Sequence, residues 1–176
     1  LESILFITGA IHRKGLALNG NMTGDSSAEA KAHHMGVELN VASCDYLGDT
    51  YTFLDCPGSN EFSQEAACAL IGADAAVVVC EAEVDRVLAL APILHQLDEL
   101  GLPRFIFVNK IDRATGRVRD VLLALQQISD KPLVLRQIPM REDEAVTGYV
   151  DLPPERAYVY PECAASHLIE LPAEMT

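Results

Sequence analysis

Two runs of strand length consist almost entirely of apolar side chains. They are Ala75–Cys80 and Phe105–Val108, and such runs are typical of parallel strands that helices cover on both faces. We therefore expect both runs to be central strands buried on both faces. A third stretch instead alternates apolar and other residues, with Val37, Leu39 and Val41 in one set. This alternation predicts an edge strand that buries only that set.

Between and after these runs the apolar residues recur with a helical period. The clearest helix is expected over residues 117–129, and a second over 87–100, bent by Pro92 and ended by Gly101. A third follows Ser59, and its inward residues are expected to be Phe62, Ala66, Leu70 and Ala73. Strands that alternate with helices predict an α/β domain with a mostly parallel sheet.

The pattern changes near residue 136. Prolines accumulate, helical periodicity weakens, and strand-like pieces appear at 148–152 and 156–160. We therefore divide the chain into a core, residues 1–135, and a small β-rich insert, residues 136–176. The charge run Arg141, Glu142, Asp143 and Glu144 within the insert is expected to be a solvated surface.

Composition and charge narrow the range of possible functions. The 176 residues are 49% hydrophobic, enough for one domain, and carry a net charge of −13. That charge disfavours direct binding of nucleic acid by this segment. The five cysteines form no CxxC pair, so we expect reduced thiols rather than a metal site or disulfides. No apolar stretch is long enough to span a membrane, and we expect a cytoplasmic protein.

The first chemical motif is Asp55-Cys56-Pro57-Gly58, at the end of a predicted strand. An aspartate at this place can hold Mg²⁺, and a glycine allows backbone N–H groups to approach a terminal phosphate. The same residue types are also common in ordinary strand-to-helix turns. This motif therefore indicates a nucleotide switch without proving one.

The second motif follows a predicted core strand and contains Asn109, Lys110 and Asp112. A carboxylate two residues after the lysine can accept hydrogen bonds from the N1–H and the 2-amino group of guanine, and the lysine stem can cover the base. A solvated loop is the alternative interpretation. The order of the two motifs favours a site for guanine nucleotides.

With these motifs the chain resembles the G domain of elongation factor G and its elongation factor G-like relatives. Further likeness lies in Thr8–Ile11, Gly15 and Gly20, and in the insert segment Gly148–Leu152. The resemblance implies a P-loop NTPase-type fold, GTP or GDP and Mg²⁺ as ligands, and action on the ribosome through the complete protein. It also implies that GTP binding or hydrolysis is coupled to translation.

The chain departs from that family in its phosphate-binding part. No Gly-x-x-x-x-Gly-Lys-Ser/Thr string is present, although such a loop cradles the phosphates. We expect that missing N-terminal residues lie outside the printed sequence or come from another chain. The segment as printed is expected to bind GTP weakly or not at all and to be inactive as a GTPase.

Two positions differ from the family's catalytic pattern. Glu38 stands where the resemblance implies a magnesium-binding threonine, and Ser59 where it implies a histidine that positions water. Glu38 could contact the ion but would repel the γ-phosphate. The alternatives are therefore a nucleotide-gated binding module with little hydrolysis and a segment that binds no nucleotide. His33 and His34 are expected to lie in a solvated loop rather than to bind a metal.

Overall fold

The computed structural model describes residues 1–16, 19–24, 36–59, 63–114, 116–143, 145–161 and 165–170. The chain forms two compact units, Leu1–Asp74 and Ala75–Thr176. The first contains the helices α1 (Glu2–Ile7) and α3 (Ser63–Ile71) and the strands β1 (Asn40–Tyr46) and β2 (Asp49–Asp55). Each unit is described below by itself.

In the first unit, β1 and β2 form an antiparallel hairpin. The turn is Leu47-Gly48, and both residues have positive φ angles, 53° and 94°. Two such residues are the requirement of a tight hairpin turn, whose twist matches that of the strands. The hairpin register places Asp55, the last residue of β2, opposite Asn40.

This register corrects the predicted face of the edge strand. The strand begins only at Asn40, and Val41 is 63% exposed whereas Cys44 is buried. Pairing places Ala42 opposite the half-buried Phe53, so the even-numbered residues of β1 face inward. Val37 and Leu39 precede the strand and are half-buried as expected, so the prediction is wrong only for Val41, which lies inside the strand.

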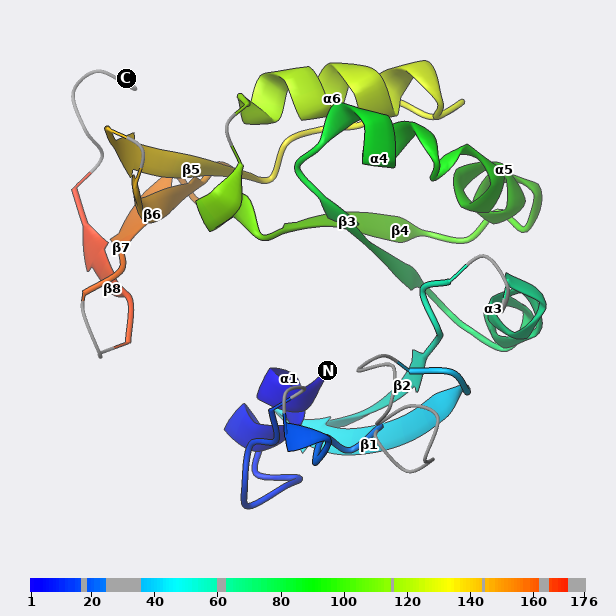
Figure 1. The fold of residues 1–176 in the computed structure, drawn as a ribbon. Coiled ribbons are helices and arrows are strands. Elements are labelled where there is room, and N and C mark those ends of the chain that lie inside the picture. The colour runs from blue at the N-terminus through cyan, green and yellow to red at the C-terminus, as the bar shows by residue number, and fades with distance from the viewer. Residues whose placement is uncertain are drawn as a thin grey trace. The chain divides into compact units, whose positions relative to one another are not determined.

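The second unit is built on the parallel pair β3 (Ala76–Glu81) and β4 (Arg104–Asn109). The connection contains α4 (Val84–Leu88) and α5 (Ala91–Glu99), and β4 leads through the 3₁₀ turn η3 (Ile111–Arg113) into α6 (Val118–Gln127). Helices α4 and α6 lie together on one side of the strand pair (Figure 1). These parallel strands with their helices confirm the predicted α/β fold class.

The prediction that these strands are buried on both faces is wrong. Val78 and Cys80 are buried, but Val77 and Val79 are 63% and 58% exposed, and Phe105 is 63% exposed. Helices α4 and α6 lie on one side of the strand pair (Figure 1), and α4 contacts both β3 and α6. Alternate residues of each strand consequently remain open on the other face.

The predicted helix over residues 87–100 is two helices. The helical conformation is interrupted between Leu88 and Ala91, and Pro92 lies in the first turn of α5. A proline is tolerated there because the N–H groups of a first turn have no partner within the helix.

The helix predicted over residues 117–129 is confirmed as α6. In α3 the buried residue is Ala69, whereas Ala66 and Leu70 are half-buried, and Phe62 lies outside the described residues.

A buried ion pair joins α5 to β4. Arg104 Nη1 lies 2.7 Å from Asp98 Oδ1, and the two side chains are 5% and 11% exposed. Arg104 Nη2 also donates to Ser129 Oγ at 2.9 Å. The hydrogen bond from Arg104 lowers the pKa of the Asp98 carboxyl. This cluster fixes the start of β4 against the helices.

The insert region is a four-stranded antiparallel sheet. Its strands are β5 (Gln137–Glu142), β6 (Ala145–Asp151), β7 (Arg156–Val159) and β8 (His167–Ile169), adjacent in that order, which confirms the strand-like pieces predicted at 148–152 and 156–160. A Cβ at Gly148 would lie 2.1 Å from Tyr158 O, so only glycine fits there. The compact units divide the chain after Asp74, and the expected boundary after residue 135 stays a prediction.

Two leucines of α6 give a direct test of this packing. Leu125 is 3% exposed and Leu123 is 55% exposed. We expect Leu125→Ala to lower the free energy of unfolding by about 2–5 kcal/mol and Leu123→Ala by less than about 1 kcal/mol. Urea denaturation measures both. Equal losses would contradict the orientation of α6 described above.

Candidate functional site

The carboxyl ends of β3 and β4 meet at one edge of the second unit. The strands pair in register from Ala76 with Arg104 to Glu81 with Asn109, so both chains leave the sheet side by side. The crevice outside the carboxyl ends of parallel strands is where ligands bind in α/β proteins. The pairing therefore brings the predicted guanine-reading segment to the expected edge.

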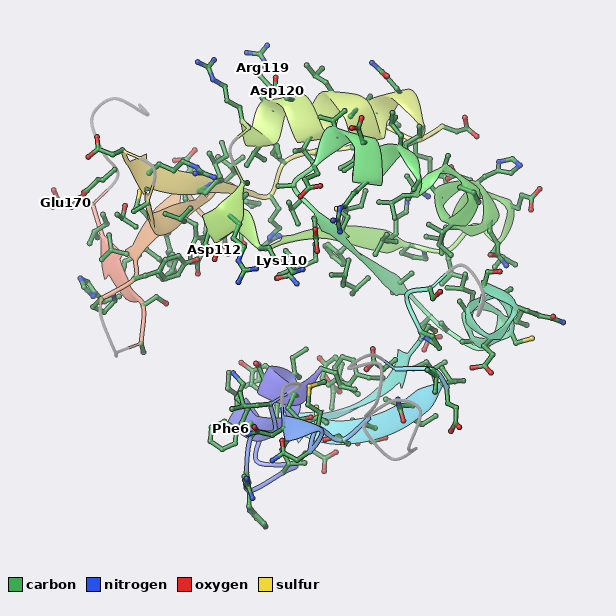
Figure 2. The ribbon with its side chains drawn as sticks, viewed as in Figure 1. Phe6, Lys110, Asp112, Arg119, Asp120 and Glu170 are labelled. Atoms are coloured by element: carbon green, nitrogen blue, oxygen red, sulfur yellow. The ribbon has the colours of Figure 1, made fainter. Side chains whose placement is uncertain are left out.

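The backbone turns sharply directly after β4. Lys110 has a positive φ of 53°, and Arg113 N donates to Lys110 O at 3.0 Å to close the η3 turn. Lys110 and Asp112 emerge beside each other where the chain enters this turn (Figure 2). Only Asn and Asp, besides Gly, adopt positive φ readily, so a lysine here indicates a backbone held by its surroundings.

Lys110 is held by Glu81, a residue that the sequence motifs do not include. Its Nζ donates to Glu81 Oε1, and Arg86 Nη1 lies 2.9 Å from Glu81 Oε2. The hydrogen bond from Lys110 lowers the pKa of the Glu81 carboxyl below its ordinary value of 4.5. One feature of the sequence could have identified Glu81: it ends the apolar strand β3, just as Asn109 ends the parallel strand β4.

Asp112 presents an open carboxylate. Its side chain is 73% exposed, and Arg113 Nε lies 3.9 Å from its Oδ2. An exposed carboxylate has only acceptor sites to offer, which suits two neighbouring N–H donors on a planar ligand. The geometry of Asp112 therefore fits the edge of a guanine base.

The β-rich sheet also reaches the η3 turn. Arg141 of β5 is half-buried, and its Nη2 donates to Ile111 O at 3.0 Å. The prediction that Arg141 belongs to a solvated charge run is thus wrong for this residue. A pocket of about 720 Å³ opens beside the turn. Its lining includes Asp112, Arg113, Leu122, Ile138 and Arg141.

The predicted switch residues lie in the first unit. Asp55 is exposed at the end of β2, and Pro57 behind it is buried. Among the described residues, a Cβ at Gly58 would meet nothing within 4 Å, so these residues leave space beside the backbone there. Ser59 is half-buried.

Glu38 belongs to the same end of the hairpin. It is exposed in a bend two residues before Asn40, the partner of Asp55, and its carbonyl accepts from Asn40 Nδ2 at 3.3 Å. Within the described ranges no three His, Cys, Asp or Glu side chains form a metal-binding group. Mg²⁺ usually takes only one or two carboxylates besides water and phosphate, and the magnesium role expected of Asp55 and Glu38 stays a prediction. His33 and His34 lie outside the described residues.

Comparison with known proteins shows which proteins the chain is similar to. Residues 1–163 match the family described as the elongation factor Tu GTP binding domain. The chain is 49% identical over 175 residues to an elongation factor G-like protein of Synechocystis sp., covering 99% of this chain and 26% of that one. It is 30% identical to elongation factor G 2 of Streptomyces coelicolor, with 93% and 24% covered.

A solved structure also matches. A crystal structure of a protein from Thermus thermophilus is similar with a TM-score of 0.88 and 32% identity, covering 98% of this chain and 26% of that one. The chain thus spans about a quarter of the length of the relatives it matches. Among the described helices, none has the length and apolar character needed to cross a membrane.

The pair formed by Glu81 and Lys110 predicts a specific pH dependence. A carboxyl with a lowered pKa in the folded state stabilises the fold above its unfolded pKa, and this contribution is lost as the pH falls through the folded value. We expect Glu81→Gln to destabilise the protein at neutral pH and to match the unsubstituted protein well below pH 4.5. Urea denaturation across this range measures the difference, with exposed Glu170→Gln as the control for one lost charge. A Glu81→Gln deficit that persists in acid would contradict the ion pair.

Proposed function

The chain belongs to the elongation factor Tu GTP binding domain family, and we propose that it binds GTP and GDP and couples them to translation as part of a longer, elongation factor G-like protein. The single observation that carries this proposal is the end of β4, where Asn109 is the last residue of a parallel strand and Lys110 and the open Asp112 follow directly. Membership in the family agrees with the class expected from the two motifs.

Guanine recognition is assigned to the second unit. Asp112 accepts hydrogen bonds from the base N1–H and 2-amino group, which adenine does not present in this arrangement. Asn109 supplies an amide at the carboxyl end of β4, and the stem of Lys110 covers the face of the base. Lys110 can do this without leaving Glu81, because the ammonium and the methylene stem are separate parts of one side chain.

Phosphate and metal binding are assigned to the first unit. Asp55 and Glu38 would hold Mg²⁺, and the backbone at Gly58 would approach the γ-phosphate. When bound, the ion neutralises negative charge on the phosphate oxygens. The exposure of both carboxylates and the open space at Gly58 support this assignment.

The rate of hydrolysis is expected to be low. Ser59 stands at the position of the water-positioning histidine, and its hydroxyl is too short to take over that role. Glu38 adds negative charge near the reacting phosphate. The alternative of a nucleotide-gated module without hydrolysis is not favoured by the relatives, which are elongation factors by name.

The proposed partner is the ribosome. The matched relatives are named as elongation factors, and by this likeness the complete polypeptide that carries this sequence would contact the ribosome. The net charge of −13 argues against RNA contact through this segment. We also propose a cytoplasmic location, in keeping with a role in translation.

Asp112→Asn should change the preferred base in the complete polypeptide. The amide can donate to the 2-oxo group of xanthine where the carboxylate accepted from the 2-amino group of guanine. We expect binding of GDP to weaken and binding of xanthosine diphosphate (XDP) to strengthen, each by about tenfold or more. Equilibrium titration measures both, with the exposed Asp120→Asn in α6 as the matched control. Unchanged guanine preference would remove Asp112 from the base site.

Ser59→His should raise the GTPase rate. Loss of a group that takes part in proton transfer or positions water commonly costs on the order of 10² to 10⁴ in rate. We expect slow ribosome-stimulated turnover by the complete polypeptide and a substantial gain with histidine, whereas Ser63→His, four residues further along at the start of α3, should bring none. Fast turnover without the substitution, and no gain with it, would show that another residue performs this role.

A further inference from the structure

We propose that Arg141 is a positioning residue for guanine recognition, which it performs by holding the η3 turn that carries Asp112. The inference rests on the proposed role of Asp112 in reading the base. It assigns to the β-rich sheet a direct part in nucleotide selectivity, because Arg141 belongs to β5 of that sheet. Arg141 itself need not touch the nucleotide.

The hydrogen bond joins the sheet to the centre of the base-reading segment. Ile111 lies between Lys110 and Asp112, and its carbonyl oxygen accepts from Arg141 Nη2 at 3.0 Å. The donor is a charged guanidinium, which makes such a bond stronger than one between neutral groups. Strand β6 also contacts η3. The turn is therefore attached to the sheet at a residue directly adjacent to Asp112.

The ladder between β5 and β6 is irregular at this position. Met140 pairs with Gly148 and Arg141 with Val146, so Thr147 of β6 has no partner in β5. The extra residue therefore belongs to β6, and β5 continues regularly through Arg141. Bulges occur often beside functional sites, and this one lies opposite the residue that bonds to the turn.

The turn is short. It is a single 3₁₀ turn without a side-chain cap at its start, and Lys110 before it is in the left-handed region. The pocket of about 720 Å³ adjoins Asp112 and Arg113, so close packing does not back these residues there. The bond between Lys110 and Glu81 holds the segment before the turn, and the bond from Arg141 holds the turn itself.

Selectivity depends on this placement. Two hydrogen bonds to the edge of a base require the carboxylate to lie within about 0.5 Å of its productive position. Without Arg141 the peptide group between Ile111 and Asp112 can rotate, and the carboxylate then meets the N1–H and 2-amino group less well. The loss should be greater for a ligand that uses both donors than for one that uses only N1–H.

Inosine diphosphate lacks the 2-amino group and therefore separates positioning from general stability. In the complete polypeptide we expect Arg141→Met to weaken binding of GDP about tenfold and that of inosine diphosphate (IDP) no more than about threefold. The ratio of the GDP affinity to the IDP affinity should therefore fall. Arg141→Lys, which keeps one charged donor, should restore part of the ratio. Arg136→Met is the matched control, because it breaks an ion pair to Asp151 within the same sheet and should leave the ratio unchanged.

Each outcome decides between the proposals. If Arg141→Met leaves the ratio unchanged while Asp112→Asn alters it, the positioning role is wrong and the proposed function stands. If the unsubstituted polypeptide does not prefer GDP to IDP, the base-reading role of Asp112 fails. Should the methionine variant not fold, Arg141→Gln, which is polar but too short to reach Ile111 O, carries the same test, and a wild-type ratio in that variant would overturn the inference.

Discussion

The in-register parallel pairing of β3 with β4 is the constraint on which the proposed guanine-reading site depends. It brings Glu81 and Asn109 to the same level at the edge of the sheet, where the next residue, Lys110, can reach the Glu81 carboxylate. The buried pair of Asp98 and Arg104 anchors the opposite end of β4 against α5. A slip of one residue would flip every side chain of the strand and separate these groups.

Much of this arrangement can be predicted from the sequence, because strands and nucleotide motifs are local patterns. The apolar runs before Glu81 and Asn109 identify the strands, and the three- and four-residue period identifies α6. The spacing from Asn109 to Asp112 predicts guanine binding, and the family that matches the chain is described as a GTP binding domain. These features depend on residues that are close together along the chain.

The remaining features depend on residues that are distant in sequence. Nothing local to Glu81 shows that it meets Lys110, and Arg141 looked like part of a solvated charge run although it bonds to Ile111. The buried face of β1 depends on its pairing with Phe53 rather than on its own alternation. Burial of a strand on both faces also requires two layers of helices, which periodicity along one strand cannot count.

The central claim is that this chain binds a nucleotide through its guanine base, and competition binding tests it most directly. Labelled GDP bound to the complete polypeptide would be displaced by unlabelled GTP or ATP at equal Mg²⁺ concentration. A site that hydrogen-bonds the guanine edge should require at least about 100-fold more ATP than GTP for the same displacement. Displacement by both nucleotides at similar concentrations would contradict the account.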